Sequence, residues 1–142
     1  MSRALTLRML LVASVATLGA CGEDARELKK ADFIRRADAI CREANVAVDK
    51  LQDEVNPDDE KAFAELTAKA FDLQLDALDR VKSLGTPDSD AKAVNEFLTE
   101  AEESFAQARD ADTEFNFGLA AKRIENLAPV AAKLGFAVCG TR

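Results

Sequence analysis

Apolar side chains recur every three or four residues in four long segments of the chain, and this period constrains the fold more than any other feature. Between Lys30 and Val55, at about 100° per residue, they fall on one side of a helix. They are Phe33, Ile34, Ala37, Ile40, Cys41, Ala44, Ala47, Val48, Leu51 and Val55. The opposite side carries Arg35, Asp38, Arg42, Asp49 and Asp53. Because no segment alternates with the two-residue period of a strand, the pattern predicts an all-α protein.

Proline and glycine mark the expected boundaries of the next two helices. Asn56-Pro57-Asp58-Asp59 places an N-cap residue before a proline and two acids, which predicts the start of a second helix. This helix is expected to run to Leu84 and to stop at Gly85. Thr86-Pro87-Asp88 repeats the signal and predicts a third helix that fades near Asp110.

A fourth helix is predicted between Phe117 and Leu134, with Gly135 as its left-handed cap. Pro129 lies on its polar side, so a kink is expected there rather than a break. The inward positions of the third helix are Val94, Phe97, Leu98, Ala101, Phe105 and Ala108. Those of the fourth are Phe117, Ala120, Ala121, Ile124, Leu127, Ala128, Ala131 and Leu134.

The second helix has an unusually wide apolar face, made of two stripes. The main stripe is Phe63, Leu66, Ala70, Leu73, Ala77, Val81 and Leu84. The second stripe, Phe71, Leu75 and Leu78, widens the apolar arc to about 200°. Such an arc is either buried between two neighbouring helices or partly exposed as a surface for a partner, and we expect burial because large exposed apolar patches are unusual.

The first 20 residues have the organisation of a signal peptide. Arg3 and Arg8 lie near the start of the chain, and an apolar stretch follows from Met9 to Leu18. Small residues precede Cys21. The apolar stretch is far shorter than the roughly 20 residues that a transmembrane helix needs. We therefore expect a cleaved leader at 1–20, a tether at 21–29 and one folded domain at 30–142.

The end of this leader, Leu18-Gly19-Ala20-Cys21, resembles the lipobox of bacterial lipoproteins. The resemblance implies attachment of diacylglycerol, with palmitate as an acyl chain, to the thiol of Cys21, and cleavage between Ala20 and Cys21. Two or more acyl chains give stable membrane anchoring, whereas one is marginal. The eight residues from Gly22 to Lys29 span at most about 28 Å. The domain is thus expected outside the cytoplasm, lipid-anchored and close to the membrane.

Lipidation of Cys21 leaves Cys41 and Cys139, an even number in an oxidising compartment, which predicts a disulfide. Four helices joined by short turns are expected to form an up-down-up-down bundle in which the first and last helices are antiparallel neighbours. In that arrangement Cys139 could reach Cys41 directly. Closing a loop of about 100 residues would stabilise the fold by roughly 4.7 kcal/mol on the chain-entropy account.

The mature part also resembles a loose group of small exported helical proteins of high-GC Gram-positive bacteria. The resemblance rests on the lipobox together with Asp32-Phe33-Ile34-Arg35-Arg36-Ala37-Asp38-Ala39-Ile40-Cys41 and Leu134-Gly135-Phe136-Ala137-Val138-Cys139-Gly140. It implies a helical domain with a cysteine near each end, and it carries no catalytic residues.

The charge of the chain argues against a nucleic-acid partner. The net charge is -7, and because the leader carries two arginines and no acid, the rest carries 17 basic against 26 acidic residues, or -9. Nucleic-acid binding needs clustered lysine and arginine, and the short basic pairs, such as Lys29-Lys30, are interleaved with acids. The partner implied by the anchor is instead the membrane, and another envelope protein is a further candidate.

The residue types that usually carry catalysis or bind metals are scarce. The chain has no His, Trp or Tyr, so the common nucleophile and general-base pairs are missing and no catalytic residue is assigned. Asp110-x-Asp112-x-Glu114 is similar to the opening of a calcium loop, but Phe115 replaces the glycine of the turn and Ala121 the bidentate glutamate. It is better interpreted as a turn with an N-cap at Asp112 or Thr113, and no metal or cofactor is expected.

Two functions remain from these observations. The first is a membrane-tethered, non-catalytic interaction module, with Phe71, Leu75 and Leu78 as its candidate partner surface. The alternative is a carrier that holds a small apolar ligand in the bundle interior. An enzyme is disfavoured. A large cavity would favour the carrier, and an exposed apolar patch would favour the interaction module.

Overall fold

The computed structural model describes residues 29–53, 56, 59–111 and 114–140. These residues form four α-helices and one short 3-10 turn, and no strand. The helices are α1 (Lys30–Asp53), α2 (Glu60–Lys82), α3 (Ala91–Arg109) and α4 (Glu114–Leu134), and the 3-10 turn η1 (Asp88–Asp90) precedes α3. The predicted all-α fold is confirmed.

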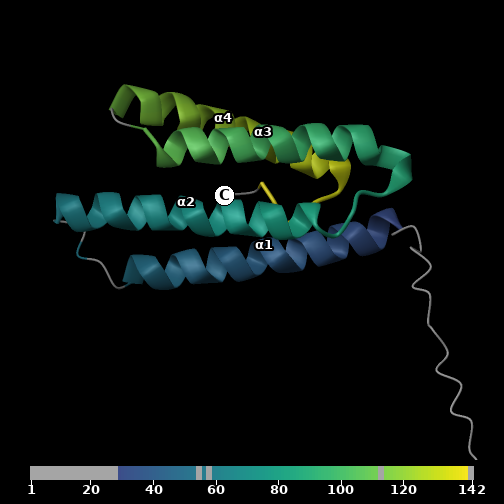
Figure 1. The fold of residues 1–142 in the computed structure, drawn as a ribbon, viewed down its shortest axis with the longest axis horizontal. Helices are drawn as coiled ribbons and strands as arrows, with labels where there is room; N and C mark the ends of the chain where they lie inside the picture. Colours follow the sequence, from purple (N-terminus) through teal and green to yellow (C-terminus); the bar gives the residue numbers. More distant parts are fainter. Residues whose placement is uncertain (1–28, 54–55, 57–58, 112–113, 141–142) are drawn as a thin grey trace, which may run out of the picture.

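The helices run up, down, up and down as two hairpins, α1 with α2 and α3 with α4 (Figure 1). Within this bundle α1 packs on α2, α2 on α3, and α3 on α4. The helices α1 and α4 are not a closely packed pair, so the expectation that they are direct neighbours is wrong. The gap arises because the residues after α4 turn back and occupy the place against α1 that α4 itself would have taken.

The core is contributed by all four helices and by the residues that follow α4. Its buried side chains are Phe33, Ala37, Cys41, Leu78, Val81, Val94, Phe97, Leu98, Ala101, Phe105, Leu127, Ala131, Leu134, Phe136 and Cys139. At its centre Phe136 lies 5.3 Å from Phe97 and 6.1 Å from Phe33, measured between ring centroids. Phe136 thus joins α1 to α3, a role that the helical period does not predict because the residue lies beyond the last periodic segment.

Two phenylalanines expected in the core are exposed instead. Phe63 has 53% of its surface exposed and Phe117 has 40%. Each is the fourth residue of its helix, α2 and α4 respectively, and these helices start at the same end of the bundle (Figure 1). Side chains in a first turn at the end of a bundle have fewer neighbours than those in its middle. The helical period therefore placed both rings on the inner face but did not predict how far the neighbouring helices reach.

The second helix begins later than predicted. Its N-cap is Asp59, whose Oδ1 accepts a hydrogen bond from the backbone N–H of Ala62 at 3.0 Å, and not Asn56. The carbonyl of Asn56 accepts the Asp59 N–H at 3.1 Å, which forms a turn before the helix. Pro57 and Asp58 lie outside the described residues, as do Val55 and the proposed caps Asp112 and Thr113. The helix ends at Lys82, and Gly85 follows with a φ of 74°.

The last helix ends as predicted, and its cap redirects the chain. Gly135 has a φ of 99°, a left-handed conformation that glycine adopts without strain. The N–H groups of Gly135 and Phe136 donate to the carbonyls of Ala132 and Ala131 at 3.1 and 3.0 Å. This pair of hydrogen bonds is a Schellman motif. It sends the C-terminal segment, Gly135–Gly140, back across the bundle toward α1. Pro129 is exposed and α4 continues through it.

Candidate ligand-binding cavity

The disulfide predicted from the cysteine count is present. Cys41 of α1 and Cys139 of the C-terminal segment are joined, with their Cα atoms 5.3 Å apart and a sequence separation of 98. Both residues are buried. The bond therefore fixes the C-terminal segment against the middle of α1.

Asp38 provides a second anchor for the same segment, and its predicted position on the polar face of α1 is wrong. The residue is only 8% exposed. Its carboxylate accepts three backbone hydrogen bonds: from Ala137 at 2.9 Å, from Val138 at 2.9 Å and from Cys139 at 3.1 Å. The three N–H groups lie beyond the end of α4, where the chain has left the helical repeat that pairs each N–H with a carbonyl four residues earlier. Asp38 lies three residues before Cys41, one turn earlier on the same face of α1. This spacing is the sequence signal that could have indicated that Asp38 and Cys41 hold the same segment.

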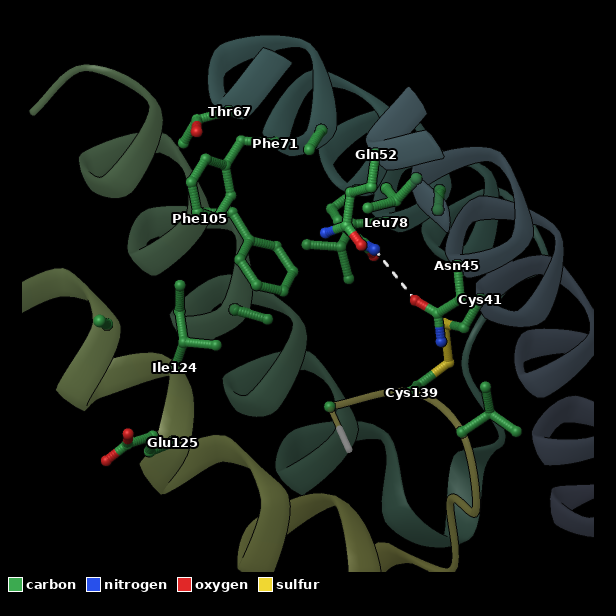
Figure 2. A pocket seen from close by; sticks show the side chains of 18 of the residues that line it. Cys41, Asn45, Gln52, Thr67, Phe71, Leu78, Phe105, Ile124, Glu125 and Cys139 are labelled. Carbon is green, nitrogen blue, oxygen red and sulfur yellow. Dashed lines mark hydrogen bonds between the residues drawn. A yellow bond between two sulfur atoms is a disulfide. The ribbon is translucent and has the colours of Figure 1, made fainter. Parts of the chain in front are cut away.

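A cavity of about 410 Å³ lies between the two hairpins, beside the disulfide. It is lined by Cys41, Asn45, Val48, Gln52, Phe63, Leu66, Thr67, Ala70, Phe71, Gln74, Ala77, Leu78, Phe97, Ala101, Phe105, Ala121, Ile124, Glu125, Val138, Cys139 and Gly140. Every helix contributes to this lining, and the C-terminal segment closes one end (Figure 2). The C-terminal segment fills the space between α1 and α4 near Asp38 and Cys41, and the cavity lies beyond it, along the later residues of α1.

One wall of the cavity is aromatic and aliphatic. Phe71 of α2 and Phe105 of α3 lie with their ring centroids 6.1 Å apart, and Ile124 of α4 extends this wall (Figure 2). Phe117 contacts Phe71 edge-on, at 6.3 Å between centroids. Because Phe63 also lines the cavity and is half-exposed, the cavity reaches the surface near the start of α2.

The opposite wall combines apolar side chains, such as Val48 and Leu78, with uncharged polar groups. The Gln74 Nε2 of α2 donates to the Asn45 Oδ1 of α1 at 3.0 Å, and both residues are partly buried. Gln52 lies at the exposed side of the same wall. The hydroxyl of Thr67 donates to the carbonyl of Phe63 in its own helix at 2.9 Å. The polar wall therefore presents mainly side-chain amides to the interior (Figure 2).

The cavity lining contains no lysine or arginine, and Glu125 is its one ionisable group that is not in the disulfide, within the described part of the chain. The Glu125 carboxylate points away from the centre of the cavity (Figure 2). No group of histidine, cysteine, aspartate and glutamate side chains that could hold a metal ion occurs in the described segments. The interior of the cavity is therefore uncharged.

The clear pKa shifts occur at ion pairs outside this lining. Hydrogen bonding to Glu43 raises the pKa of Arg80, and hydrogen bonding to Asp110 raises the pKa of Arg109. The same contact with Arg109 lowers the pKa of Asp110. These pairs join neighbouring surface side chains, so their shifts reflect ion pairing and do not point to acid–base chemistry in the cavity.

The residues of the second stripe on α2 lie at different depths. Leu78 is buried in the core and lines the cavity, whereas Phe71 and Leu75 are partly buried and pack against the core. Leu18, Gly19, Ala20 and Cys21 lie outside the described residues, so lipidation and cleavage stay predictions. None of the described helices is both long and apolar enough to cross a membrane.

The fold and the cavity together define an all-α bundle, clamped by a disulfide, with an apolar site between its hairpins. No family model matches the chain, no curated protein matches it, and no solved structure matches it.

Proposed function

We propose that the protein is a membrane-anchored, extracytoplasmic carrier that holds a small apolar molecule between its two helical hairpins. The observation that carries this proposal is the cavity of about 410 Å³ with an aromatic wall built by Phe71 and Phe105. Binding sites for small molecules are typically concave, mostly apolar and roughly 300–1,000 Å³ in volume.

The predicted anchor supports the same function. Lipid on Cys21 and a tether ending at Lys29 would hold the domain near the membrane, where apolar molecules are concentrated. The cavity-lining residues of α1 begin at Cys41, in the middle of the helix, and continue toward the end away from the tether. A ligand could then enter the cavity while the anchored end stays on the membrane.

A pair of substitutions on α2 tests this proposal. Ala70 is half-buried and lines the cavity, so Ala70→Phe should fill part of it. Ala64 is exposed on the same helix and does not line the cavity, so Ala64→Phe is the matched control. The intact protein is purified from its membrane, and co-purifying molecules are extracted and identified by mass spectrometry. An apolar molecule retained by the parent and by Ala64→Phe, but lost from Ala70→Phe, supports the carrier; equal retention in all three contradicts it.

The interaction module remains a second candidate because α4 exposes two large apolar side chains near its start. Phe117 is 40% exposed and Leu119 is 51% exposed. A photo-crosslinking residue introduced at position 119 should capture an envelope protein in cells if this end of α4 binds a partner. Crosslinking no greater than that from the exposed position 132 would count against this function.

A further inference from the structure

The two walls of the cavity differ in chemistry, and this difference constrains what the cavity can hold. The wall from α3 and α4 presents Phe105 and Ile124, which can contact only apolar parts of a ligand. The lining from α1 and α2 is also largely apolar, but it carries Asn45 and Gln74, which are hydrogen-bonded to each other. A ligand that fills the space between the walls must therefore be apolar over most of its surface and meet amide groups at one place.

The hydrogen bond between Asn45 and Gln74 uses one N–H donor and one carbonyl acceptor. The two side chains together have further donors and a further acceptor. A side-chain amide has two N–H donors and one carbonyl acceptor. After the bond at 3.0 Å, the N–H groups of Asn45 and the carbonyl of Gln74 remain for another partner. If both amides were turned over, the remaining groups would be the N–H groups of Gln74 and the carbonyl of Asn45. In either orientation the wall offers a neutral donor and a neutral acceptor.

The charges around the cavity disfavour a charged ligand. An anion placed against this lining would meet no lysine or arginine of the described residues, and it would approach a chain of net charge -7. Burying a carboxylate or phosphate without a cationic partner is costly. A cation would be equally unpaired in the interior, because the Glu125 carboxylate points away from it (Figure 2).

From these walls we infer that the ligand is an uncharged amphiphile: an aliphatic chain that carries a hydroxyl, ester or amide group. The chain packs against Phe71, Phe105 and Ile124, and the polar group exchanges hydrogen bonds with Asn45 and Gln74. Fatty acids fall outside this class because their head group is an anionic carboxylate, and phospholipids fall outside it because every phospholipid head group carries a charged phosphate. The inference rests on the proposed carrier function and adds the ligand class to it.

Photoreactive probes of equal chain length separate this class from the alternatives. Each probe carries a diazirine and an alkyne on a dodecyl chain, and the probes end in methyl, hydroxyl, primary amide, carboxylate or trimethylammonium. The intact protein is labelled in its own membrane, and the labelled peptides are mapped by mass spectrometry. The hydroxyl and amide probes should label peptides of α3 and α4 at least about tenfold more than the carboxylate and trimethylammonium probes, which corresponds to about 1.4 kcal/mol. This labelling should be lost in Ala70→Phe and retained in Ala64→Phe.

Two further variants test the named groups within one membrane and one probe, so that different partitioning of the probes cannot explain the result. Gln52 is exposed at the cavity, and Gln52→Lys adds the missing cation; it should raise labelling by the carboxylate probe several-fold. Replacing Asn45 and Gln74 together by leucine removes both partners, a change that is often tolerated in folding. This double variant should label equally with the methyl and hydroxyl probes.

The outcomes distinguish the inference from the function on which it rests. If labelling depends on the cavity but the carboxylate probe equals or exceeds the hydroxyl and amide probes, the ligand class is overturned and the carrier function stands. The ligand class is also overturned, and the carrier function stands, if all five probes label the cavity equally or if the trimethylammonium probe labels it most. If no probe gives labelling that Ala70→Phe removes, the carrier function itself fails.

Discussion

Replacing Asp38 by alanine removes one carboxylate that accepts three backbone hydrogen bonds from the C-terminal segment. Hydrogen bonds to charged groups contribute roughly 1.5–3 kcal/mol each, and an unpaired buried N–H costs roughly 1–3 kcal/mol. The bond from Cys139 is buried, whereas those from Ala137 and Val138 are partly buried, so water can replace the carboxylate at these two. We therefore expect a loss of about 3–5 kcal/mol, a large part of the roughly 5–15 kcal/mol of a typical domain.

Thermal unfolding of the oxidised protein, followed by circular dichroism at neutral pH, measures this loss. For a folded part of this size about 1 kcal/mol lowers Tm by roughly 4 °C, so Asp38→Ala should melt about 12–20 °C below the parent. Asp38→Asn keeps one acceptor oxygen and should lose about half as much. The matched control is Asp76→Ala, because Asp76 is exposed on α2; such surface changes are usually within about 0.5 kcal/mol.

The effect should also depend on the disulfide, because Asp38 and Cys41 anchor the same segment. When Cys41 and Cys139 are both replaced by serine, Asp38→Ala should lower the free energy of unfolding by less than it does in the oxidised parent. The two losses are not additive because both anchors hold the same segment. The segment contributes Val138 and Cys139 to the cavity lining, so a loosened segment should also weaken ligand retention. If Asp38→Ala melts within about 3 °C of the parent, the three hydrogen bonds do not stabilise the fold as argued.

Three further predictions follow from the anchor, the disulfide and α2. Cys21→Ala should abolish both processing and detergent-dependent membrane partitioning, and a variant that is still cut and membrane-bound would exclude the lipobox. Peptide mapping without reductant should give one cross-linked pair containing Cys41 and Cys139; free thiols at both positions in protein from the envelope would refute the bond. Leu75→Asp should destabilise the fold by about 1–3 kcal/mol, since a charge would replace a side chain packed against the core. A denaturant midpoint equal to the parent's would show that Leu75 is exposed.

Much of the helical architecture could be predicted from the sequence because it depends on local features. The 3.6-residue period determines which side of each helix is apolar, and it correctly placed Phe97, Leu98 and Leu127 in the core. Gly135 could be predicted as a cap because a glycine directly after the last apolar position of a helix commonly adopts the left-handed conformation. This preference is a local property of the backbone. The helix start at Asp59 was missed by three residues because Asn56 and Asp59 are both good caps, and propensity does not choose between them.

The candidate site could not be predicted because it depends on contacts between distant parts of the chain. Asp38 has the polarity and period of a solvent-facing residue, and only the return of the C-terminal segment makes it a buried acceptor. The same return places Phe136 in the core and keeps α1 and α4 apart, which leaves room for the cavity. Period and capping act within a few residues, whereas a cavity is the space that packed helices fail to fill. The sequence alone therefore determined the helices, their inner faces and the cysteine pair, and the tertiary structure decided where the bundle stays open.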